Sequence, residues 1–92
     1  MDCSCLTMTV FAEFGISLPD DPQAQMGYGT AVSGAPQAGD LVFWSEDGSG
    51  IATHVGIATG NGTVIHASAY AGYVVETPIE HIPGYLGARR LL

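Results

Sequence analysis

The chain has 92 residues, of which 47% are hydrophobic, and nine acidic residues against only Arg89 and Arg90 give it a formal net charge of -7 at pH 7. This length suffices for one small domain and is too short for two that each bury a core. The acidic balance argues against nucleic acid or an anionic membrane surface as a partner, because both select basic patches. The low charged fraction and 13 glycines suit short strands joined by tight turns, so we expect an α+β or mostly β fold.

The first predicted element is a helix from about Cys3 to Phe14. Apolar residues recur at helical spacing one turn after Cys3, at Leu6, Val10 and Phe14. Asp2 is placed to cap the helix start, and Gly15 is placed to end the helix in a left-handed conformation. Cys5 lies about 200° around this helix from Cys3, so the two thiols cannot serve one site equally. We therefore assign Cys5 to packing.

The rest of the chain predicts a loop and then a sheet. Residues 16–36 contain three prolines and several glycines, which indicates a loop with at most one short helical turn near Ala24. β-type segments separated by turn residues follow, over Asp40 to Ser45, Thr53 to Thr59, Thr63 to Ser68 and Tyr73 to Thr77, with a further candidate over Leu86 to Leu91. Their short lengths are typical of a curled antiparallel sheet. No apolar stretch approaches the length that crosses a bilayer, and no leader for secretion opens the chain.

The connection Gly60-Asn61-Gly62 predicts a hairpin between two of these strands. A three-residue loop favours a type I turn followed by a left-handed Gly62. Thr59 would then oppose Thr63, which places His54 and His66 on one face, roughly 7 to 8 Å apart at the backbone. A two-residue loop would instead place them on opposite faces.

Cys3 is the candidate nucleophile, because a cysteine in the first turn of a helix lies near the positive end of the helix dipole. That position favours the reactive thiolate. The backbone amide of Ser4, beside the thiol, could bind the oxyanion that forms when a carbonyl is attacked.

His54 is the candidate base. It alternates with Gly56 and Ala58 on one strand face, so we expect a thin sheet there and a closely packed helix that brings Cys3 within reach. His66, on the same face under the three-residue loop, could orient the His54 ring.

Each of these residues also has a structural interpretation. Free cysteine can behave as a small apolar residue, and either histidine could be a satisfied polar group in a half-buried strand. His81, in a proline-bounded stretch, is expected at the surface, and Asp40, Glu46 and Asp47 are expected to cap turns or be solvated. Two cysteines and two histidines also form a common zinc set, but one residue between the cysteines is too few, so we expect no metal and no cofactor.

Five blocks of the sequence, taken in order, are Asp2-Cys3-Ser4-Cys5-Leu6, Gly15-Ile16-Ser17-Leu18-Pro19, Gly39-Asp40-Leu41-Val42-Phe43-Trp44, His54-Val55-Gly56-Ile57 and Val64-Ile65-His66-Ala67. Together they resemble the NlpC-type cell-wall cysteine peptidases. The chain departs from the family pattern at Cys5, where the family has glycine. It also lacks the family's upstream segment with a Tyr and a Gly-rich stretch, so we expect residues 1–92 to be a single domain truncated at its N-terminus.

The resemblance implies a papain-like fold in which the helix that carries Cys3 packs on the curled sheet. It implies Cys3 as nucleophile, His54 as base and His66 as the residue that orients the base. The implied substrate is the stem peptide of peptidoglycan, cut between a γ-linked D-glutamate and a diamino acid, and the implied location is the cell envelope, the secreted fraction or a phage particle. Two alternatives stay open, a binding or scaffold domain of the same fold without turnover and the zinc site.

Overall fold

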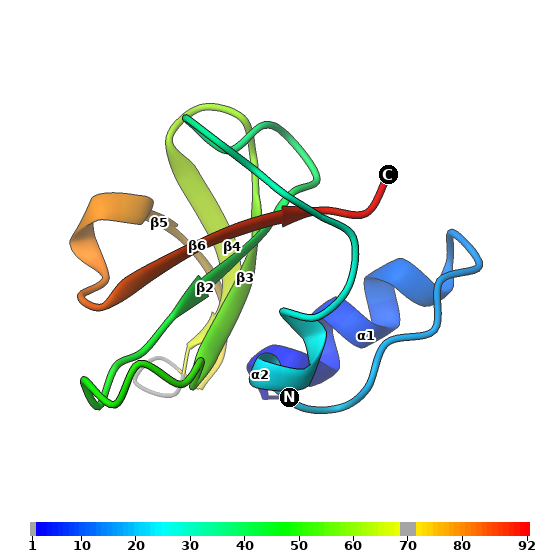
Figure 1. Cartoon of the computed structure of the whole chain (residues 1–92), viewed down its shortest axis with the longest axis horizontal. Helices are drawn as coiled ribbons and strands as arrows, with labels where there is room; N and C mark the ends of the chain where they lie inside the picture. The colour runs from blue at the N-terminus through cyan, green and yellow to red at the C-terminus, as the bar shows by residue number, and fades with distance from the viewer. Residues whose placement is uncertain (1, 69–71) are drawn as a thin grey trace.

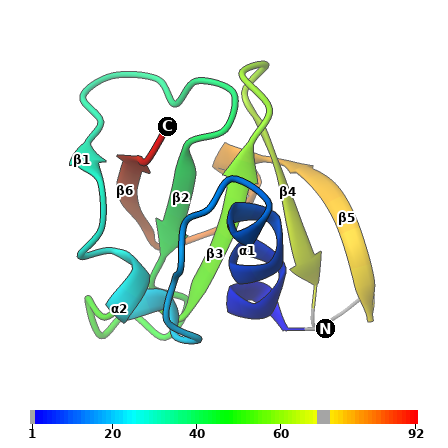
Figure 2. The ribbon, with the colours of Figure 1, turned by 90° about the vertical axis from the view of Figure 1, so that its right-hand side faces the viewer.

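The computed structural model describes residues 2–68 and 72–92. Two helices come first, followed by six strands and a 3-10 turn: α1 (Cys3–Ala12), α2 (Pro22–Gln25), β1 (Thr30–Ala31), β2 (Leu41–Trp44), β3 (His54–Ala58), β4 (Thr63–Ser68), β5 (Tyr73–Pro78), η1 (Ile79–His81) and β6 (Tyr85–Arg90). The strands, most of which Figure 1 labels, form one antiparallel sheet. Their order is β1-β6-β2-β3-β4-β5, which Figure 2 shows from left to right. The predicted α+β class is confirmed. In the part of the chain described, no helix is long and apolar enough to cross a membrane.

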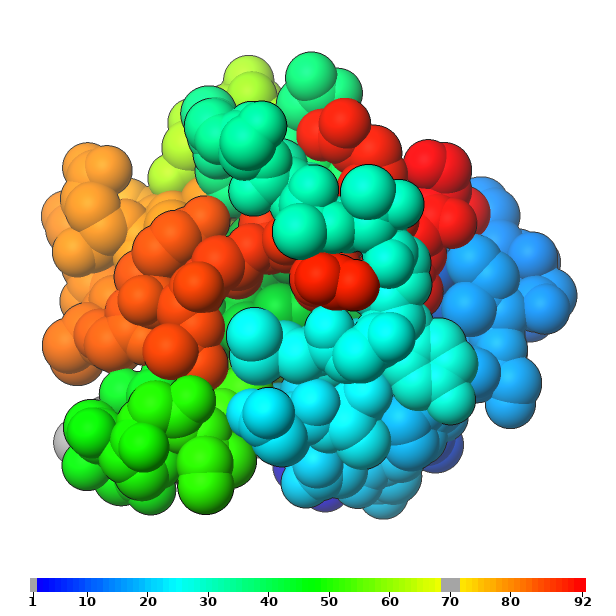
Figure 3. Space-filling view, viewed as in Figure 1, coloured from blue at the N-terminus to red at the C-terminus, as the bar shows by residue number. Residues whose placement is uncertain are grey.

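Every strand predicted from the sequence is present, with ends that agree to within one residue. Residues 16–36 were expected to hold no strand, and here the prediction is wrong, because β1 pairs with β6 through Thr30 opposite Arg90 and Ala31 opposite Arg89. The Arg89 guanidinium holds the segment before β1 in place by donating to the carbonyl oxygens of Tyr28 and Gly29, each at 2.9 Å. Figure 3 shows this segment, in cyan, lying beside the red end of β6. The expected helical turn near Ala24 is α2.

Helix α1 begins as predicted and ends earlier. The Asp2 carboxylate accepts a hydrogen bond from the Cys5 amide at 2.8 Å and caps the helix start. Gly15 takes the expected left-handed conformation, with φ of 76°, but the helix already ends at Ala12. Phe14 consequently lies beyond the helix with 60% of its surface exposed.

The buried face of α1 differs from the predicted apolar one. Ser4, Thr7 and Phe11 are buried, whereas Leu6 and Val10 are only partly buried. The polar positions are satisfied by Gln25, which is fully buried and accepts from the Thr7 hydroxyl at 2.6 Å. The Gln25 amide nitrogen donates to the carbonyl oxygens of Ser4 at 3.1 Å and Pro19 at 2.8 Å. Hydrogen bonds to α2 therefore decide which face of α1 is buried.

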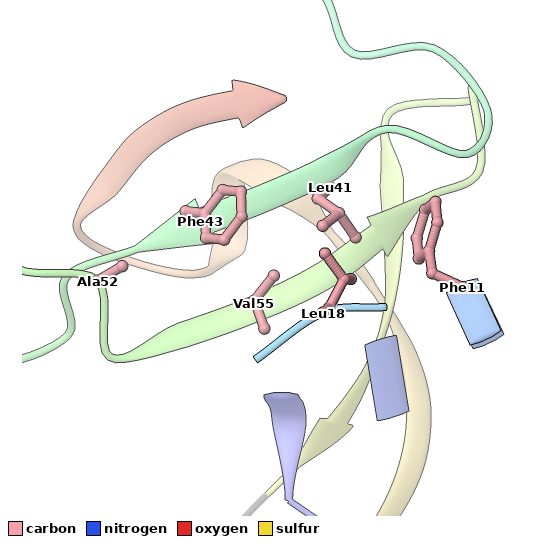
Figure 4. Close-up of a cluster of buried hydrophobic side chains, with 6 residues drawn as sticks. All are labelled: Phe11, Leu18, Leu41, Phe43, Ala52 and Val55. Atoms are coloured by element: carbon pink, nitrogen blue, oxygen red, sulfur yellow. The ribbon is translucent and has the colours of Figure 1, made fainter. Parts of the chain in front are cut away.

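The sheet has a core on each face. On the α1 side, Figure 4 shows the first core, made of Phe11, Leu18, Leu41, Phe43, Ala52 and Val55. On the other side lies a second core, made of Val42, Trp44, Ala58, Val64 and Ala88. Figure 2 shows α1 lying across β3 and β4. Consecutive residues of β2 and β3 thus supply opposite cores, as the alternation of a strand requires.

An ion pair between a buried carboxylate and a partly exposed guanidinium joins β6 to the residue before β2. Asp40 is 2% exposed, and its two carboxylate oxygens accept from the Arg90 guanidinium at 3.0 and 2.9 Å. The guanidinium lowers the pKa of Asp40 below its ordinary value. The prediction that Asp40 caps a turn or is solvated is confirmed in its first form, because the Gln37 amide donates to its carboxylate at 2.8 Å.

The hairpin between β3 and β4 has the predicted register. Ile57 lies opposite Ile65 and Ala58 opposite Val64, and the Thr59 amide donates to the Thr63 carbonyl oxygen at 3.1 Å. Gly62 is left-handed, with φ of 80°. Gly60 also has positive φ, at 89°, so the predicted type I turn is wrong.

Candidate active site

A cleft of about 600 Å³ opens where the start of α1 meets one end of β3, β4 and β5. The residues that line it include Cys3, Glu46, His54, His66, Thr77 and His81. The structure thus brings together the three residues that the sequence singled out as nucleophile, base and orienting residue. Cys5 does not line the cleft, in keeping with its predicted place on another side of the helix.

The two histidines are in direct contact, which confirms that they share one face of the hairpin. His54 Nε2 lies 2.7 Å from His66 Nδ1, and the rings meet edge to face at 86°. His66 Nε2 in turn lies 2.9 Å from the Thr77 hydroxyl. A chain of hydrogen bonds therefore runs from β3 through β4 to β5.

One arrangement of protons satisfies this chain and leaves a base in the cleft. If His54 Nε2–H donates to His66 Nδ1, then His66 Nε2–H can donate to the Thr77 hydroxyl oxygen. His54 Nδ1 then keeps its lone pair. Since His66 engages Nε2, Nδ1 is the nitrogen of His54 that could accept a proton from a group in the cleft.

Burial keeps both imidazoles neutral. It lowers the pKa of His54 below 6.5 and is the largest cause of the same change at His66. The neighbouring His54 lowers the pKa of His66 further, while Glu46 opposes the change. At neutral pH His54 is therefore in the form that can accept a proton.

The Cys3 thiol does not behave as its position in the helix predicted. Burial raises its pKa above 9.0, and the charge of Asp2 adds to this, although the backbone amides of Val55 and Ser4 act in the opposite direction. The expected stabilisation of the thiolate by the helix start is thus outweighed by desolvation. The Cys3 sulfur lies 3.9 Å from the carbonyl oxygen of Thr53, the residue that precedes His54 in the sequence.

Ser4 lies beside Cys3 but does not itself line the cleft. Its hydroxyl is buried and donates to the Asp20 carboxylate at 2.7 Å. The role of its amide as an oxyanion donor stays a prediction. The helix start nevertheless holds that amide close enough to the Cys3 sulfur to lower its pKa.

The small residues beside His54 serve a different purpose from the predicted one. Helix α1 packs on the opposite face, where Val55 lies, so Gly56 does not admit the helix. A Cβ on Gly56 would lie 2.4 Å from Val64 Cγ2 and 3.0 Å from His66 Cβ. The glycine therefore lets β4 approach β3 closely enough for the histidines to meet.

Glu46 and Thr77 were missed as site residues. Glu46 Oε1 lies 3.9 Å from His54 Nδ1, although the sequence suggested only a cap or a solvated turn. Thr77 is a diagonal neighbour of His66, since β5 pairs His66 with Val75, and this register was the signal that could have identified it.

His81 is exposed, as predicted, but also borders the cleft. Within residues 2–68 and 72–92, no three His, Cys, Asp or Glu residues are grouped to hold a metal ion.

Comparison with known proteins places this arrangement in one family. A probable endopeptidase of Corynebacterium glutamicum is 41% identical over 90 residues, covering 96% of this chain and 41% of the relative. The γ-D-glutamyl-L-lysine dipeptidyl-peptidase of Bacillus cereus is 38% identical over 97 residues, covering 99% of this chain and 29% of the relative. The solved structure of the peptidoglycan hydrolase RipB from Mycobacterium tuberculosis superposes with a TM-score of 0.85 at 31% identity, covering 99% of this chain and 45% of that one.

The chain therefore spans less than half the length of each of these relatives. The family model described as "NlpC/P60 family" matches residues 1–89. With its helix start, paired histidines and antiparallel sheet all lying within that match, the chain belongs to the NlpC/P60 family.

Proposed function

We propose that the chain is a cysteine endopeptidase that hydrolyses amide bonds in the stem peptides of peptidoglycan. The observation that carries the proposal is the cleft in which Cys3 meets the hydrogen-bonded pair His54 and His66. A thiol, a base and a residue that orients the base are the parts that nucleophilic hydrolysis of an amide requires. The family and the names of its relatives support peptidoglycan as the substrate.

Acylation begins from a neutral thiol and a neutral imidazole. Cys3 passes its proton to His54 Nδ1 while the sulfur attacks the amide carbon, and the Ser4 amide donates a hydrogen bond to the oxyanion that forms. The carbon–nitrogen bond then breaks, and His54 returns the proton to the departing amine. A thioester to Cys3 remains.

Water then hydrolyses the thioester, with His54 Nδ1 again as the base. His54 Nδ1 takes a proton from the water as its oxygen attacks the thioester carbon, and the carbon–sulfur bond breaks with return of a proton to Cys3. His66 and Thr77 stabilise the His54 imidazolium in both half-reactions. His66 Nδ1 can accept a hydrogen bond from His54 Nε2, and the Thr77 hydroxyl can in turn accept one from His66 Nε2.

We further propose the bond between γ-linked D-glutamate and a diamino acid as the one that is cut. The support is the similarity to the Bacillus cereus relative, whose name specifies γ-D-glutamyl-L-lysine. We also propose that the chain acts at the cell envelope, in the secreted fraction or in a phage particle; the similarity to a peptidoglycan hydrolase supports the cell wall as its target.

The two cysteines allow a matched test. A γ-D-glutamyl-L-lysine peptide is incubated with the wild-type chain and with the variants Cys3→Ala and Cys5→Ala, and the release of free amine is followed. We expect release to vanish in Cys3→Ala and to persist in Cys5→Ala, because only Cys3 lines the cleft. Equal loss in both variants, or release by Cys3→Ala, would refute the proposed nucleophile.

A domain that binds the cell wall without cutting it is the second candidate. The observation that favours it is the raised pKa of Cys3, which leaves little thiolate at neutral pH. It predicts retention on peptidoglycan with no amine release and slow alkylation of Cys3 at pH 7. Amine release that depends on Cys3 would exclude it.

A further inference from the structure

We infer that Glu46 recognises a positive charge on the leaving-group side of the scissile bond, such as the free side-chain amine of a diamino acid. The inference deepens the proposed function and rests on it. Its basis is the 3.9 Å distance between Glu46 Oε1 and His54 Nδ1, in a cleft that both residues line.

The geometry determines which part of the substrate meets Glu46. His54 Nε2 is engaged by His66, so Nδ1 must return the proton to the departing amine. That transfer requires the amine within about 3 Å of Nδ1. The amine therefore lies within roughly 7 Å of the Glu46 carboxylate, a span that the four-carbon stem of a lysine leaving residue can bridge.

Glu46 is the carboxylate in the cleft that is available for this contact. The other acid there, Asp2, accepts from the Cys5 amide at 2.8 Å as the helix cap. Both arginines of the chain are committed elsewhere, Arg89 to backbone carbonyl oxygens and Arg90 to Asp40. The Glu46 side chain is 49% exposed, so a soluble cation can reach it.

The loop that carries Glu46 is held in place before any substrate arrives. The Glu46 amide donates to the Thr53 hydroxyl at 2.9 Å. Asp47 accepts from the Ser49 amide at 3.0 Å, and the Ser45 hydroxyl accepts from the Gly50 amide at 3.0 Å. A loop whose backbone is already held loses little entropy when its glutamate binds a cation, which favours recognition over an incidental contact.

The test compares two substrates that differ only in charge. Hydrolysis of γ-D-glutamyl-L-lysine peptide and of its Nε-acetyl-lysine analogue is measured for wild type, Glu46→Gln and the control Glu80→Gln, whose exposed carboxylate lies outside this cleft. We expect wild type and Glu80→Gln to prefer the charged substrate by about two- to fivefold in kcat/KM, as a half-exposed ion pair would give. In Glu46→Gln the preference should disappear through loss on the charged substrate alone.

An equal fall for both substrates would overturn the inference, since it would mean that Glu46 acts on His54 instead. An unchanged preference in Glu46→Gln would overturn it as well. Absence of turnover by wild type on both substrates would refute the proposed function, and in that case binding of the two peptides to Cys3→Ala is compared by calorimetry with and without Glu46→Gln. Tighter binding of the charged peptide that depends on Glu46 supports the inference, and equal binding overturns it.

Discussion

At the scale of single residues, the site depends on Thr77, which ends the hydrogen-bond chain from His54. In Thr77→Val the His66 Nε2–H loses its acceptor at 2.9 Å, so His66 is free to rotate or change tautomer. We expect kcat/KM for peptide hydrolysis to fall about tenfold, in line with the loss of a partner that orients a base.

Thr77→Ser is the matched control, because it keeps the hydroxyl and should restore most of the activity. The pH profile separates positioning from folding: Thr77→Val should shift its acidic limb, since the imidazolium loses stabilisation and the apparent pKa of the base falls. A profile of unchanged shape, or failure of serine to restore activity, would contradict this role.

The protonation of Cys3 and His54 explains the resting state of the site. Burial lowers the pKa of His54 and raises that of Cys3, so each is held in its neutral form. A preformed thiolate and imidazolium pair is therefore disfavoured in the free chain. In the proposed mechanism, proton transfer therefore accompanies the attack of the sulfur. A bound substrate that displaces water from the cleft would change the pKa of Cys3 and that of His54 together.

At the scale of elements, the approach of β4 to β3 depends on Gly56. In Gly56→Ala the new methyl group would lie 2.4 Å from Val64 Cγ2, so β4 must move outward. We expect the free energy of unfolding to fall by about 1 to 3 kcal/mol and kcat/KM to fall about tenfold or more as His66 withdraws from His54.

Gly27→Ala is the control for Gly56→Ala, because Gly27 also lacks a positive φ and its Cβ would meet only the Ala24 carbonyl oxygen at 3.4 Å. Urea unfolding and amine release are measured for both variants. Equal stability of Gly56→Ala and Gly27→Ala would show that the two strands have more room than the structure indicates.

The contact between α1 and α2 depends on Gln25. Gln25→Ala removes three hydrogen bonds and leaves the buried Thr7 hydroxyl and the Ser4 carbonyl oxygen without this partner. We expect a loss of about 3 kcal/mol in the free energy of unfolding, measured in urea. Gln37→Ala, at an exposed side chain, should change it by less than about 0.5 kcal/mol. Similar values for the two variants would contradict the role of Gln25.

The elements show what the sequence could and could not predict. Strand ends and the shared face of His54 and His66 follow from local signals, namely alternation and the Gly60-Asn61-Gly62 connection. The buried face of α1 does not, because Ser4 and Thr7 are buried only through bonds to a distant glutamine. Strand β1 has two residues and exists only because β6 lies beside it, so its own composition carries no signal.

The candidate site shows the same division. Cys3, His54 and His66 could be chosen by residue type and spacing, since nucleophiles and bases are few in this chain. Glu46 and Thr77 were missed because glutamate and threonine are common at turns and edges, and only the tertiary arrangement places them near a histidine ring. The direction of the pKa of Cys3 was missed because burial cannot be read from the first turn of a helix.

At the scale of the whole molecule, stability should be highest between pH 6.5 and 9.0. His54 and His66 have lowered pKa values, so below 6.5 the unfolded chain binds more protons and the folded state loses stability as pH falls. Cys3 has a raised pKa, so above 9.0 the unfolded chain releases its proton first and stability falls as pH rises. Urea unfolding across this range measures both limbs.

Two variants identify the groups responsible for the fall of stability at acidic and at alkaline pH. Cys3→Ser should remove the contribution of the thiol to the alkaline fall, and His66→Gln should make the acidic fall shallower. The ion pair between Asp40 and Arg90 acts in a lower pH range. It stabilises the folded state above pH 3.8, and this stabilisation is lost as the pH falls through the lowered pKa of Asp40. A stability that stays constant from pH 5 to 7 would contradict the assignment to the histidines.

The order of strands has a consequence for how this protein would fail on warming. The hydrogen bonds that align His54 run outward through β4 to β5, and among residues 2–68 and 72–92 β5 is the last strand of the sheet and pairs with β4 alone. Fraying of an edge strand costs less than melting the core. Thr77 would leave His66 first, so most of the activity would be lost while α1, β2 and β3 were still folded, and heat inactivation would precede thermal denaturation.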